Sequence, residues 1–312
     1  MNLSFTRLAL VASIAAPLLA TVAFAFTPNV LFESDRILAI DKPAGIAHHN
    51  DEEAGELGIV SLLREYYQRT RGDDASRLYG VHRLDRVTSG ILLFAKDQQM
   101  AGILSKQFRE NQVIKYYTGI SNKKPKKKKQ GWVKGNMVRG RRKSWYLENQ
   151  DPLSPSSKET NDNYAVTRFF SAGLGDLDLF KLDVEKRDDI SNPKTCLLFR
   201  PHTGKTHQLR VAAKSLGLPL LGDPVYGGDL SSPVPARTFL HATAIHIPLS
   251  GDDKQHEDIG HNSVTIWCPP PFASSLWEES AQDSFESVVS NLFQKNCECP
   301  EIISKIRARQ IN

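Results

Sequence analysis

The stretch Gly80-Val81-His82-Arg83-Leu84-Asp85-Arg86-Val87-Thr88-Ser89-Gly90-Ile91 places a carboxylate between two arginines, directly before an apolar run. The Thr88-Ser89-Gly90 turn and the apolar residues 91–95 predict a strand that begins close to this carboxylate. An Asp flanked by two arginines is by itself more often a structural ion pair than a catalytic group. A second polar segment is therefore needed to interpret Asp85.

The second polar segment is Arg200-Pro201-His202-Thr203-Gly204-Lys205-Thr206-His207-Gln208-Leu209-Arg210, in which a glycine turn opens a helix. Backbone N–H groups at a helix N-terminus, together with basic side chains, favour bound anions. The side chains concerned are Lys205, His207, Gln208 and Arg210. A carboxylate and a basic cluster, both on turns at strand ends, are what a site for a phosphodiester substrate needs.

The order of the predicted elements indicates an α+β fold. Strands are predicted at residues 37–41, 91–95, 113–120, 177–185, 195–200 and 264–267. Helices are predicted at residues 97–110 and 206–216, and a capping box at Ser275 and Glu278 begins a third, amphipathic one. Strands and helices do not alternate regularly, which favours α+β over a doubly wound sheet. Two polar stretches between residues 123 and 194 are interpreted as surface loops or insertions.

The charge of the chain is unevenly distributed. The 312 residues include 40 Lys plus Arg and 35 Asp plus Glu, a net charge of +5, and 40% are apolar, which excludes a disordered chain. Residues 115–145 contain twelve Lys plus Arg and no acidic residue, so subtraction leaves −7 for the rest. One dense basic segment on an acidic protein is typical of a chain that grips a polyanion, although a solvated basic loop is an equal alternative.

The two ends of the chain are expected to lie outside the folded domain. Residues 1–26 have the apolar run and the Ala23-Phe24-Ala25 ending of a cleavable leader. An organelle address, in a plastid or mitochondrion, is the leading interpretation; the alternatives are a cytoplasmic protein or one anchored in a membrane by an uncleaved leader. No stable membrane association is expected after the leader is removed. The catalytic domain is then predicted at 27–295, with a basic insertion at about 121–145 and a tail at 296–312.

No metal site is expected from the spacing of cysteines and histidines. The four cysteines, Cys196, Cys268, Cys297 and Cys299, show neither a disulfide framework nor a zinc pattern, and we interpret them as reduced thiols. His48, His49, His241 and His246 are likewise interpreted as structural.

Four ordered blocks of this sequence resemble the RluA-type RNA pseudouridine synthases, across roughly residues 30–272. They are Val30-Leu31-Phe32-Glu33 through Asp41-Lys42-Pro43-Ala44-Gly45; His82-Arg83-Leu84-Asp85 with Thr88-Ser89-Gly90; Val113-Ile114-Lys115-Tyr116-Tyr117; and Thr203-Gly204-Lys205-Thr206-His207-Gln208-Leu209-Arg210 with Gly217-Leu218-Pro219 and Gly222-Asp223-Pro224-Val225-Tyr226-Gly227. The resemblance implies that family's catalytic fold, a mixed, mainly antiparallel sheet with flanking helices and loops.

The resemblance also implies the chemistry. An enzyme of this kind detaches uracil from its ribose, rotates it and rejoins it through a carbon–carbon bond, with no metal or organic cofactor. Asp85 would be the nucleophile, attacking either the anomeric carbon or the ring, and the sequence leaves both routes open. Arg210 matches the basic partner of the aspartate. Tyr117 matches a tyrosine that packs on the uracil and assists the late proton removal; without the match it would be a core aromatic.

The expected partner is structured RNA, ribosomal or transfer, bound by a monomer. Arg83 matches the arginine that fills the space of the flipped base, whereas His82 is more readily a structural histidine. Lys115, Lys205, His207 and Gln208 are further expected contacts. The basic insertion is expected to clamp RNA next to the site, with Trp132, Trp145 and Tyr146 interleaved among the cations; its assigned residues are Lys126, Lys127, Lys128, Lys129, Arg141 and Arg142.

Two other functions remain open at this stage. A catalytically silent RNA-binding protein could retain the fold, but it would have no reason to keep Asp85, Tyr117 and Arg210 together. A hydrolase that cleaves a glycosidic bond would need a second carboxylate, and no motif supplies one. The leading interpretation is an RNA pseudouridine synthase that isomerises specific uridines.

Overall fold

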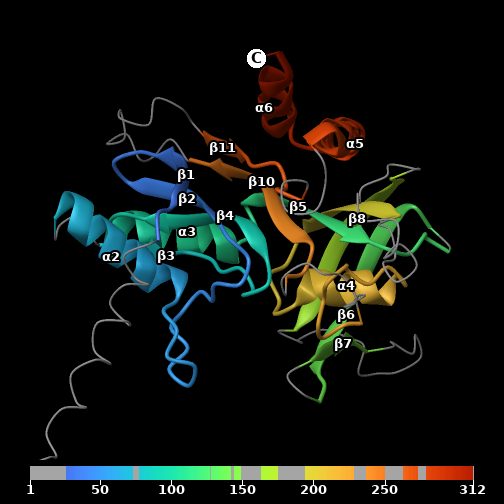
Figure 1. Cartoon of the computed structure of the whole chain (residues 1–312), viewed down its shortest axis with the longest axis horizontal. Helices are drawn as coiled ribbons and strands as arrows, with labels where there is room; N and C mark the ends of the chain where they lie inside the picture. Colours follow the sequence, from blue (N-terminus) through green and yellow to red (C-terminus); the bar gives the residue numbers. More distant parts are fainter. Residues whose placement is uncertain are drawn as a thin grey trace, which may run out of the picture.

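One twisted sheet carries the other elements of the described chain (Figure 1). The computed structural model describes residues 26–72, 77–126, 128–141, 144–148, 163–174, 194–227, 237–249, 263–272 and 279–311. The strands are β1 (Asn29–Glu33), β2 (Ile37–Lys42), β3 (Tyr79–Gly80), β4 (Ser89–Ala95), β5 (Ile114–Ser121), β6 (Gln130–Arg139), β7 (Trp145–Leu147), β8 (Tyr164–Gly173), β9 (Thr195–Pro201), β10 (Leu240–Pro248) and β11 (Ser263–Trp267).

The strand order brings distant parts of the sequence together. It reads β1-β2-β4-β10-β5-β9-β8-β6-β7, with β3 paired to β4 and β11 paired to β10. The late strand β10 lies between β4 and β5: His241 is opposite Ser89 in a parallel ladder, and Ala242 is opposite Tyr117 in an antiparallel one. The turn that carries Asp85 ends at the start of β4. The sheet therefore places Asp85 and Tyr117 on neighbouring parts of one surface, although β4 and β5 do not pair directly.

Gly90 permits the close approach of β4 and β10. Its φ is +109°, and a Cβ built there would lie 2.4 Å from the carbonyl oxygen of Ala242 and 2.5 Å from its nitrogen. Only glycine combines this backbone angle with such a contact. The Thr88-Ser89-Gly90 turn is thus a structural requirement of the site as well as a motif.

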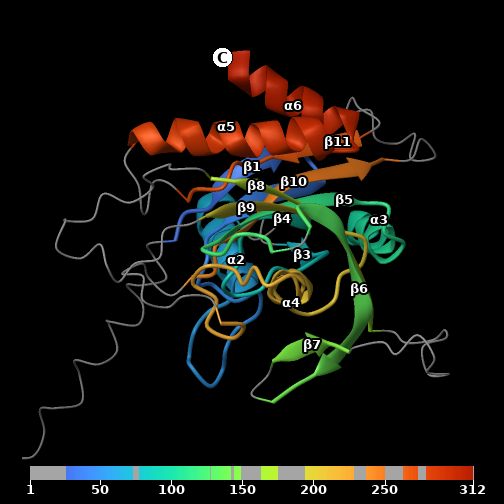
Figure 2. The same ribbon diagram turned by 90° about the vertical axis from the view of Figure 1, so that its right-hand side faces the viewer.

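Helices cover both faces of the sheet (Figure 2). They are α2 (Ile59–Arg71), α3 (Gln98–Arg109), α4 (Gln208–Ser215), α5 (Glu279–Asn296) and α6 (Pro300–Ile311). The helices α5 and α6 lie on one side, where they bury Tyr116 and Phe170, and α4 lies on the other, against Phe199. Because side chains alternate along a strand, residues of β5 and β9 point in turn to the α4 face and to the α5 face.

The α+β prediction and most of the predicted elements are confirmed. The strands expected at residues 37–41, 91–95, 113–120, 195–200 and 264–267 correspond to β2, β4, β5, β9 and β11. The three expected helices correspond to α3, α4 and α5. The side chain of Asp97 caps α3, accepting a hydrogen bond from the Met100 amide. The strand expected at residues 177–185 and the capping box at Ser275 and Glu278 lie outside the described residues.

Two strands that were not predicted follow the lysine-rich stretch. Eleven residues of the predicted insertion at 121–145 lie in β6 and β7, and β6 pairs with β8 over seven residue pairs, from Gln130 opposite Phe170 to Asn136 opposite Tyr164. The sequence of β6 contains two glycines and Lys134, residue types that are depleted in strands, so its pattern did not predict a strand. Val133 of β6 and Phe169 of β8 point to the same face of the sheet, and their apolar side chains belong to the core under α4.

The boundary predicted at residue 295 is wrong. The helix α6 follows α5 directly, and its Ile302 and Ile306 are buried in the same core as Phe285 and Phe293. The helix α6 has only a short pattern of apolar residues, and the preceding Cys297-Glu298-Cys299-Pro300 segment was interpreted as the start of a tail. At the other end, residues 1–25 lie outside the described chain, so the organelle leader stays a prediction. Among the described helices, none is long and apolar enough to cross a membrane.

Replacing Ile302 by Ala tests whether α6 belongs to the domain. Removing a fully buried isoleucine leaves a cavity, so we expect the free energy of unfolding to fall by about 2–5 kcal/mol in urea denaturation. Ser304→Ala, on the exposed side of α6, is the matched control and should leave the midpoint almost unchanged. If α6 did not pack on the domain, the two variants would have the same free energy of unfolding.

Candidate active site

A cavity of about 540 Å³ opens where the Asp85 turn, β5 and the turn before α4 meet. Eight of the residues expected to act on RNA line it: His82, Arg83, Asp85, Lys115, Tyr117, Lys205, His207 and Gln208. They come from three segments that are more than a hundred residues apart at the extremes. The sheet order described above therefore assembles a single site from the predicted blocks.

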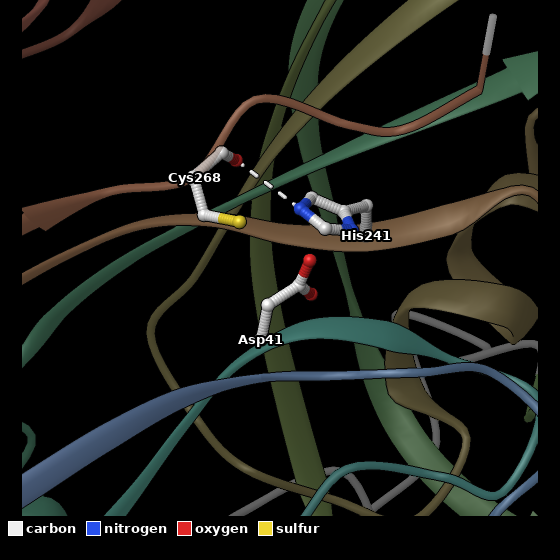
Figure 3. A group of neighbouring side chains, drawn as sticks. All are labelled: Asp41, His241 and Cys268. Carbon is white, nitrogen blue, oxygen red and sulfur yellow. Dashed lines mark hydrogen bonds between the residues drawn. The ribbon is translucent and has the colours of Figure 1, made fainter. Parts of the chain in front are cut away.

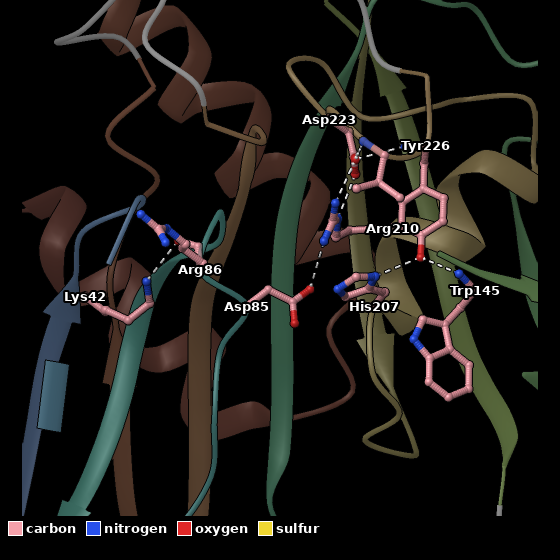
Figure 4. A network of polar contacts seen from close by, with 9 residues as sticks. Lys42, Asp85, Arg86, Trp145, His207, Arg210, Asp223 and Tyr226 are labelled. Atoms are coloured by element: carbon pink, nitrogen blue, oxygen red, sulfur yellow. Dashed lines mark hydrogen bonds and ion pairs between the residues drawn. The ribbon is translucent and has the colours of Figure 1, made fainter. Parts of the chain in front are cut away.

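Asp85 faces a buried guanidinium. Arg210 Nη1 lies 3.5 Å from Asp85 Oδ2, and the side chain of Arg210 is only 4% exposed, against 20% for Asp85. The guanidinium is held by Asp223, which accepts from Nε and Nη2 at 2.8 Å each (Figure 4). Burial lowers the pKa of Arg210, but the hydrogen bonds and charge of Asp223, with the charge of Asp85, raise it overall. The cation is thus permanent.

Asp223 is a site residue that the sequence analysis did not assign. It is fully buried, and besides Arg210 it accepts hydrogen bonds from the amides of Val225 and Tyr226 at 2.9 and 3.1 Å. A bidentate pair fixes the plane of the guanidinium, and in doing so directs Nη1 to Asp85. The Gly222-Asp223-Pro224 block indicates a carboxylate in a turn. Its spacing in the sequence does not show that this carboxylate pairs with Arg210.

His207 lies beside Asp85 and is held by Tyr226. Tyr226 Oη accepts from the amide of Trp145 at 2.9 Å and shares a hydrogen bond of 2.8 Å with His207 Nδ1. The other ring nitrogen of His207, Nε2, faces Asp85 in Figure 4. Burial lowers the pKa of His207, against the opposite effect of the Asp85 charge. Its φ of +57° begins α4 in the left-handed region.

Tyr117 lines the same cavity with its phenol protonated. Burial, together with the charge of Asp85, raises the pKa of Tyr117 well above its usual range. Its ring packs between the core that contains β4 and the core under α4. Tyr117 therefore presents an apolar ring next to the carboxylate, as a planar base requires.

The structural interpretation of His82 agrees with its contacts. Its Nε2 accepts the Leu93 amide at 3.0 Å, and its ring stacks on Phe108 at 4.6 Å. Burial lowers the pKa of His82 to about 3. A neutral ring that ties the Asp85 turn to β4 positions the turn, whereas Arg83 is exposed at the mouth of the cavity.

Gln208 also has a structural role, and its assignment as an RNA contact is a prediction that its geometry opposes. Its Oε1 accepts from Thr203 Oγ1 and the Lys205 amide at 2.8 and 2.9 Å, and its Nε2 donates to the Val166 carbonyl and Thr167 Oγ1. Both ends of the amide are thus engaged with protein atoms. The side chain fastens the basic turn to β8.

Lys42 anchors the turn of the first block to the Asp85 turn. It is fully buried, its Nζ donates to the carbonyls of Pro43 and Ile46 at 2.8 and 2.9 Å, and burial lowers its pKa to about 8. The Gly45 amide donates to the Arg86 carbonyl at 2.7 Å, and Arg86 Nε returns a bond to the Gly45 carbonyl. The two turns therefore form one unit (Figure 4).

The described lysines of the lysine-rich loop do not line the cavity. On β5, Lys115 and Tyr117 line the cavity, and the loop begins after Ser121, four residues or about 13 Å beyond Tyr117. Lys126, Lys128 and Lys129 are not among the residues that line the cavity, and Lys127 and Arg142 lie outside the described part of the chain. The RNA clamp next to the site stays a prediction for this loop. Arg141 lies instead at a second groove, described below.

Two groups of described residues bring three possible metal ligands together, which the spacing did not predict. They are Asp41, His241 and Cys268, and His246, Cys299 and Glu301. In the first group (Figure 3), His241 Nε2 donates to the Cys268 carbonyl at 3.1 Å, and Nδ1 accepts from Ser89 Oγ at 2.9 Å. Both nitrogens are occupied, so this cluster is a polar network that joins β2, β4 and β10.

Comparison with known proteins agrees with the geometry of the site. The model of the RNA pseudouridylate synthase family matches residues 36–215. The chain belongs to the RluA-type RNA pseudouridine synthase family. Enzymes of this family isomerise uridine to pseudouridine in RNA. The matched range includes Asp85, Tyr117 and Arg210.

Relatives of this pseudouridine synthase cover most of the chain. An uncharacterized RNA pseudouridine synthase of Haemophilus influenzae is 35% identical over 243 residues, 78% of this chain and 87% of the relative. The ribosomal large subunit pseudouridine synthase C of Rickettsia bellii is 35% identical over 219 residues, 70% of this chain and 63% of the relative. In structure, human RNA pseudouridylate synthase domain-containing protein 4 matches with a TM-score of 0.56 at 22% identity, over 86% of this chain and 96% of that one. That likeness shows the fold.

The buried pair predicts an asymmetry between two aspartates. Asp223→Asn leaves a buried guanidinium without its bidentate partner, so we expect the free energy of unfolding to fall by about 3–5 kcal/mol. Asp85→Asn removes only a 3.5 Å contact to a partly exposed carboxylate and should change stability far less. Thermal and urea unfolding of both variants make the comparison. Equal losses would contradict the assignment of Asp223 as the partner that holds Arg210.

Proposed function

We propose that this pseudouridine synthase modifies a uridine in structured ribosomal RNA, with Asp85 as its nucleophile. The observation that carries the proposal is the position of Asp85: its carboxylate is at the cavity surface, next to a guanidinium whose other edge is neutralised by Asp223. A carboxylate nucleophile must be ionised while partly shielded from water, and an adjacent fixed cation supports that state. The name of the Rickettsia relative supports the ribosomal substrate.

The chemistry proposed for each residue follows from its place. Asp85 Oδ attacks the nucleoside and forms a bond to either the anomeric carbon or the ring, and the bond from uracil nitrogen to ribose breaks. The uracil turns and joins ribose through carbon, and the Asp85 carboxylate is released. The proton on that carbon passes to this carboxylate, and the ring nitrogen that has left ribose takes up a proton, so no atom is gained or lost. Tyr117 supplies the apolar face on which the base turns, and its neutral phenol lines the cavity together with Asp85.

Access to this cavity requires an unstacked uridine. A base inside a folded RNA cannot reach a carboxylate at the bottom of a cavity unless it is flipped out, at a cost of a few kcal/mol. Arg83 is exposed at the mouth, where a planar cation can stack on the neighbouring bases and offset that cost. The lysine loop, which begins about 13 Å beyond Tyr117 along β5, supplies phosphate attraction at a distance from the reacting base.

Mapping of pseudouridine tests the proposal. The full chain is incubated with large-subunit ribosomal RNA and, separately, transfer RNA. We expect product on ribosomal RNA, and a loss of roughly 10³-fold or more in rate for Asp85→Asn, as for removal of other catalytic nucleophiles. Asp35→Asn, in the exposed turn between β1 and β2, is the control. Product from Asp85→Asn would overturn the nucleophile, and RNA binding without product from wild type would favour the silent binding protein.

Lys115 predicts a pH dependence of RNA binding. Burial lowers its pKa to about 8, so the side chain is charged below that pH and neutral above it. We expect RNA affinity, measured by anisotropy, to fall as pH rises through about 8. The slope of log affinity against log salt should weaken by about 0.7, the value of one phosphate contact on a single strand. Lys115→Arg keeps its charge and should lose this step, whereas an unchanged profile would assign the titration to Lys42 or another group.

A further inference from the structure

A second groove, of about 600 Å³, lies beside the catalytic cavity. The β6–β7 hairpin, the end of α4 and the turn at Val225 form its walls. Three exposed cations line it: Arg139, Arg141 and Lys214. No described carboxylate lines it. The groove is therefore suited to a ligand that carries negative charge.

The groove also offers an aromatic surface. Tyr146 lies in the hairpin with 51% of its surface exposed, next to the partly buried Trp145. A large exposed aromatic among cations is the combination on which nucleic-acid bases stack while their phosphates are held. A free inorganic anion would use the cations but not the ring.

The side chain of Tyr226 connects the groove to the catalytic cavity. Tyr226 forms part of the groove, and its hydroxyl joins the Trp145 amide to His207 Nδ1, which lines the cavity (Figure 4). The cation of Arg210 lies 5.0 Å from the Tyr226 ring, and that of Lys214 lies 5.7 Å from it. A strand of RNA that leaves the cavity over this wall meets the groove next.

A second aromatic and basic patch on β6 points elsewhere. Trp132 is 47% exposed, with Lys134 at 4.9 Å and Arg168 at 5.1 Å from its ring. Its neighbour Val133 belongs to the core under α4, so Trp132 points to the opposite face, that of α5. Trp132 packs against His202, with 5.1 Å between the ring centroids, whereas Tyr146 lies in the groove that Tyr226 connects to His207 in the cavity.

We propose that this groove binds an unpaired nucleotide of the substrate RNA near the target uridine, with its base on Tyr146 and its phosphates on Arg139, Arg141 and Lys214. The inference rests on the proposed function and specifies it, because it makes target selection depend on a second unstacked base. Binding there fixes the hairpin at Trp145, whose amide holds Tyr226 and, through it, His207. The nucleotide thus contacts the element that orients the ring next to Asp85.

Variants of the two patches test the proposal. The readouts are the dissociation constant for fluorescein-labelled decauridylate, from anisotropy, and kcat and KM on large-subunit ribosomal RNA. We expect Tyr146→Ala to weaken binding and raise KM by about 5- to 150-fold, the effect of one lost base stack. Tyr146→Phe keeps the ring and should behave as wild type. Trp132→Ala, on the opposite face, is the matched comparison and should weaken binding and raise KM less than Tyr146→Ala does.

The outcomes separate this proposal from the proposed function. Weaker binding for Tyr146→Ala than for Trp132→Ala supports the groove. Equal affinities, or a larger effect of Trp132→Ala, overturn it even when pseudouridine is formed. If wild type forms no pseudouridine while Tyr146→Ala still weakens binding, the proposed function fails and the nucleotide site stands. Ultraviolet cross-linking of 4-thiouridine RNA to the peptide containing Tyr146, mapped by mass spectrometry, must agree with the affinities.

Discussion

The site depends on one buried ion pair, Arg210 with Asp223. A guanidinium that is almost fully buried is tolerated only when an opposite charge and hydrogen-bond acceptors compensate its loss of water. The carboxylate of Asp223 supplies both, because it accepts from Nε and Nη2 at 2.8 Å each. The pair leaves Nη1 directed at Asp85, so the positive charge next to the carboxylate is set before any RNA arrives. The charged groups around Asp85 therefore need little rearrangement during the proposed reaction. Asp223 also accepts a hydrogen bond from the amide of Tyr226, and the hydroxyl of Tyr226 is hydrogen-bonded to His207.

Several turns, rather than one rigid element, hold the reacting groups. Lys42 and Arg86 tie the first block to the Asp85 turn, His82 ties that turn to β4, and Gln208 ties the basic turn to β8. His82 and Gln208 were expected to contact RNA, but all four of these residues use polar side-chain atoms within the fold. A catalytic loop can be exposed and still be precise when its supporting side chains are buried.

The sequence predicted the site better than it predicted the sheet. Asp85, Tyr117 and Arg210 could be predicted because each lies in a sequence motif, and a motif can be recognised without knowing the order of the strands. Asp223 was missed because its partner is defined in space and not by spacing. The strand β6 was missed because its two glycines and Lys134 oppose strand formation, and it is stabilised by pairing with β8 over seven residues. The position of the lysine loop could not be predicted, because charge density carries no information on distance from Asp85.

The position of β10 has a consequence for how the enzyme is made. Asp85 and Tyr117 become neighbours only when the strand at residues 240–248 inserts between β4 and β5. During synthesis, a chain that has emerged as far as α4 holds every reacting group but lacks the strand that aligns them. Contacts of such long sequence separation form late and slowly. The candidate site is therefore complete only after residues 240–248 have been synthesised and have inserted between β4 and β5.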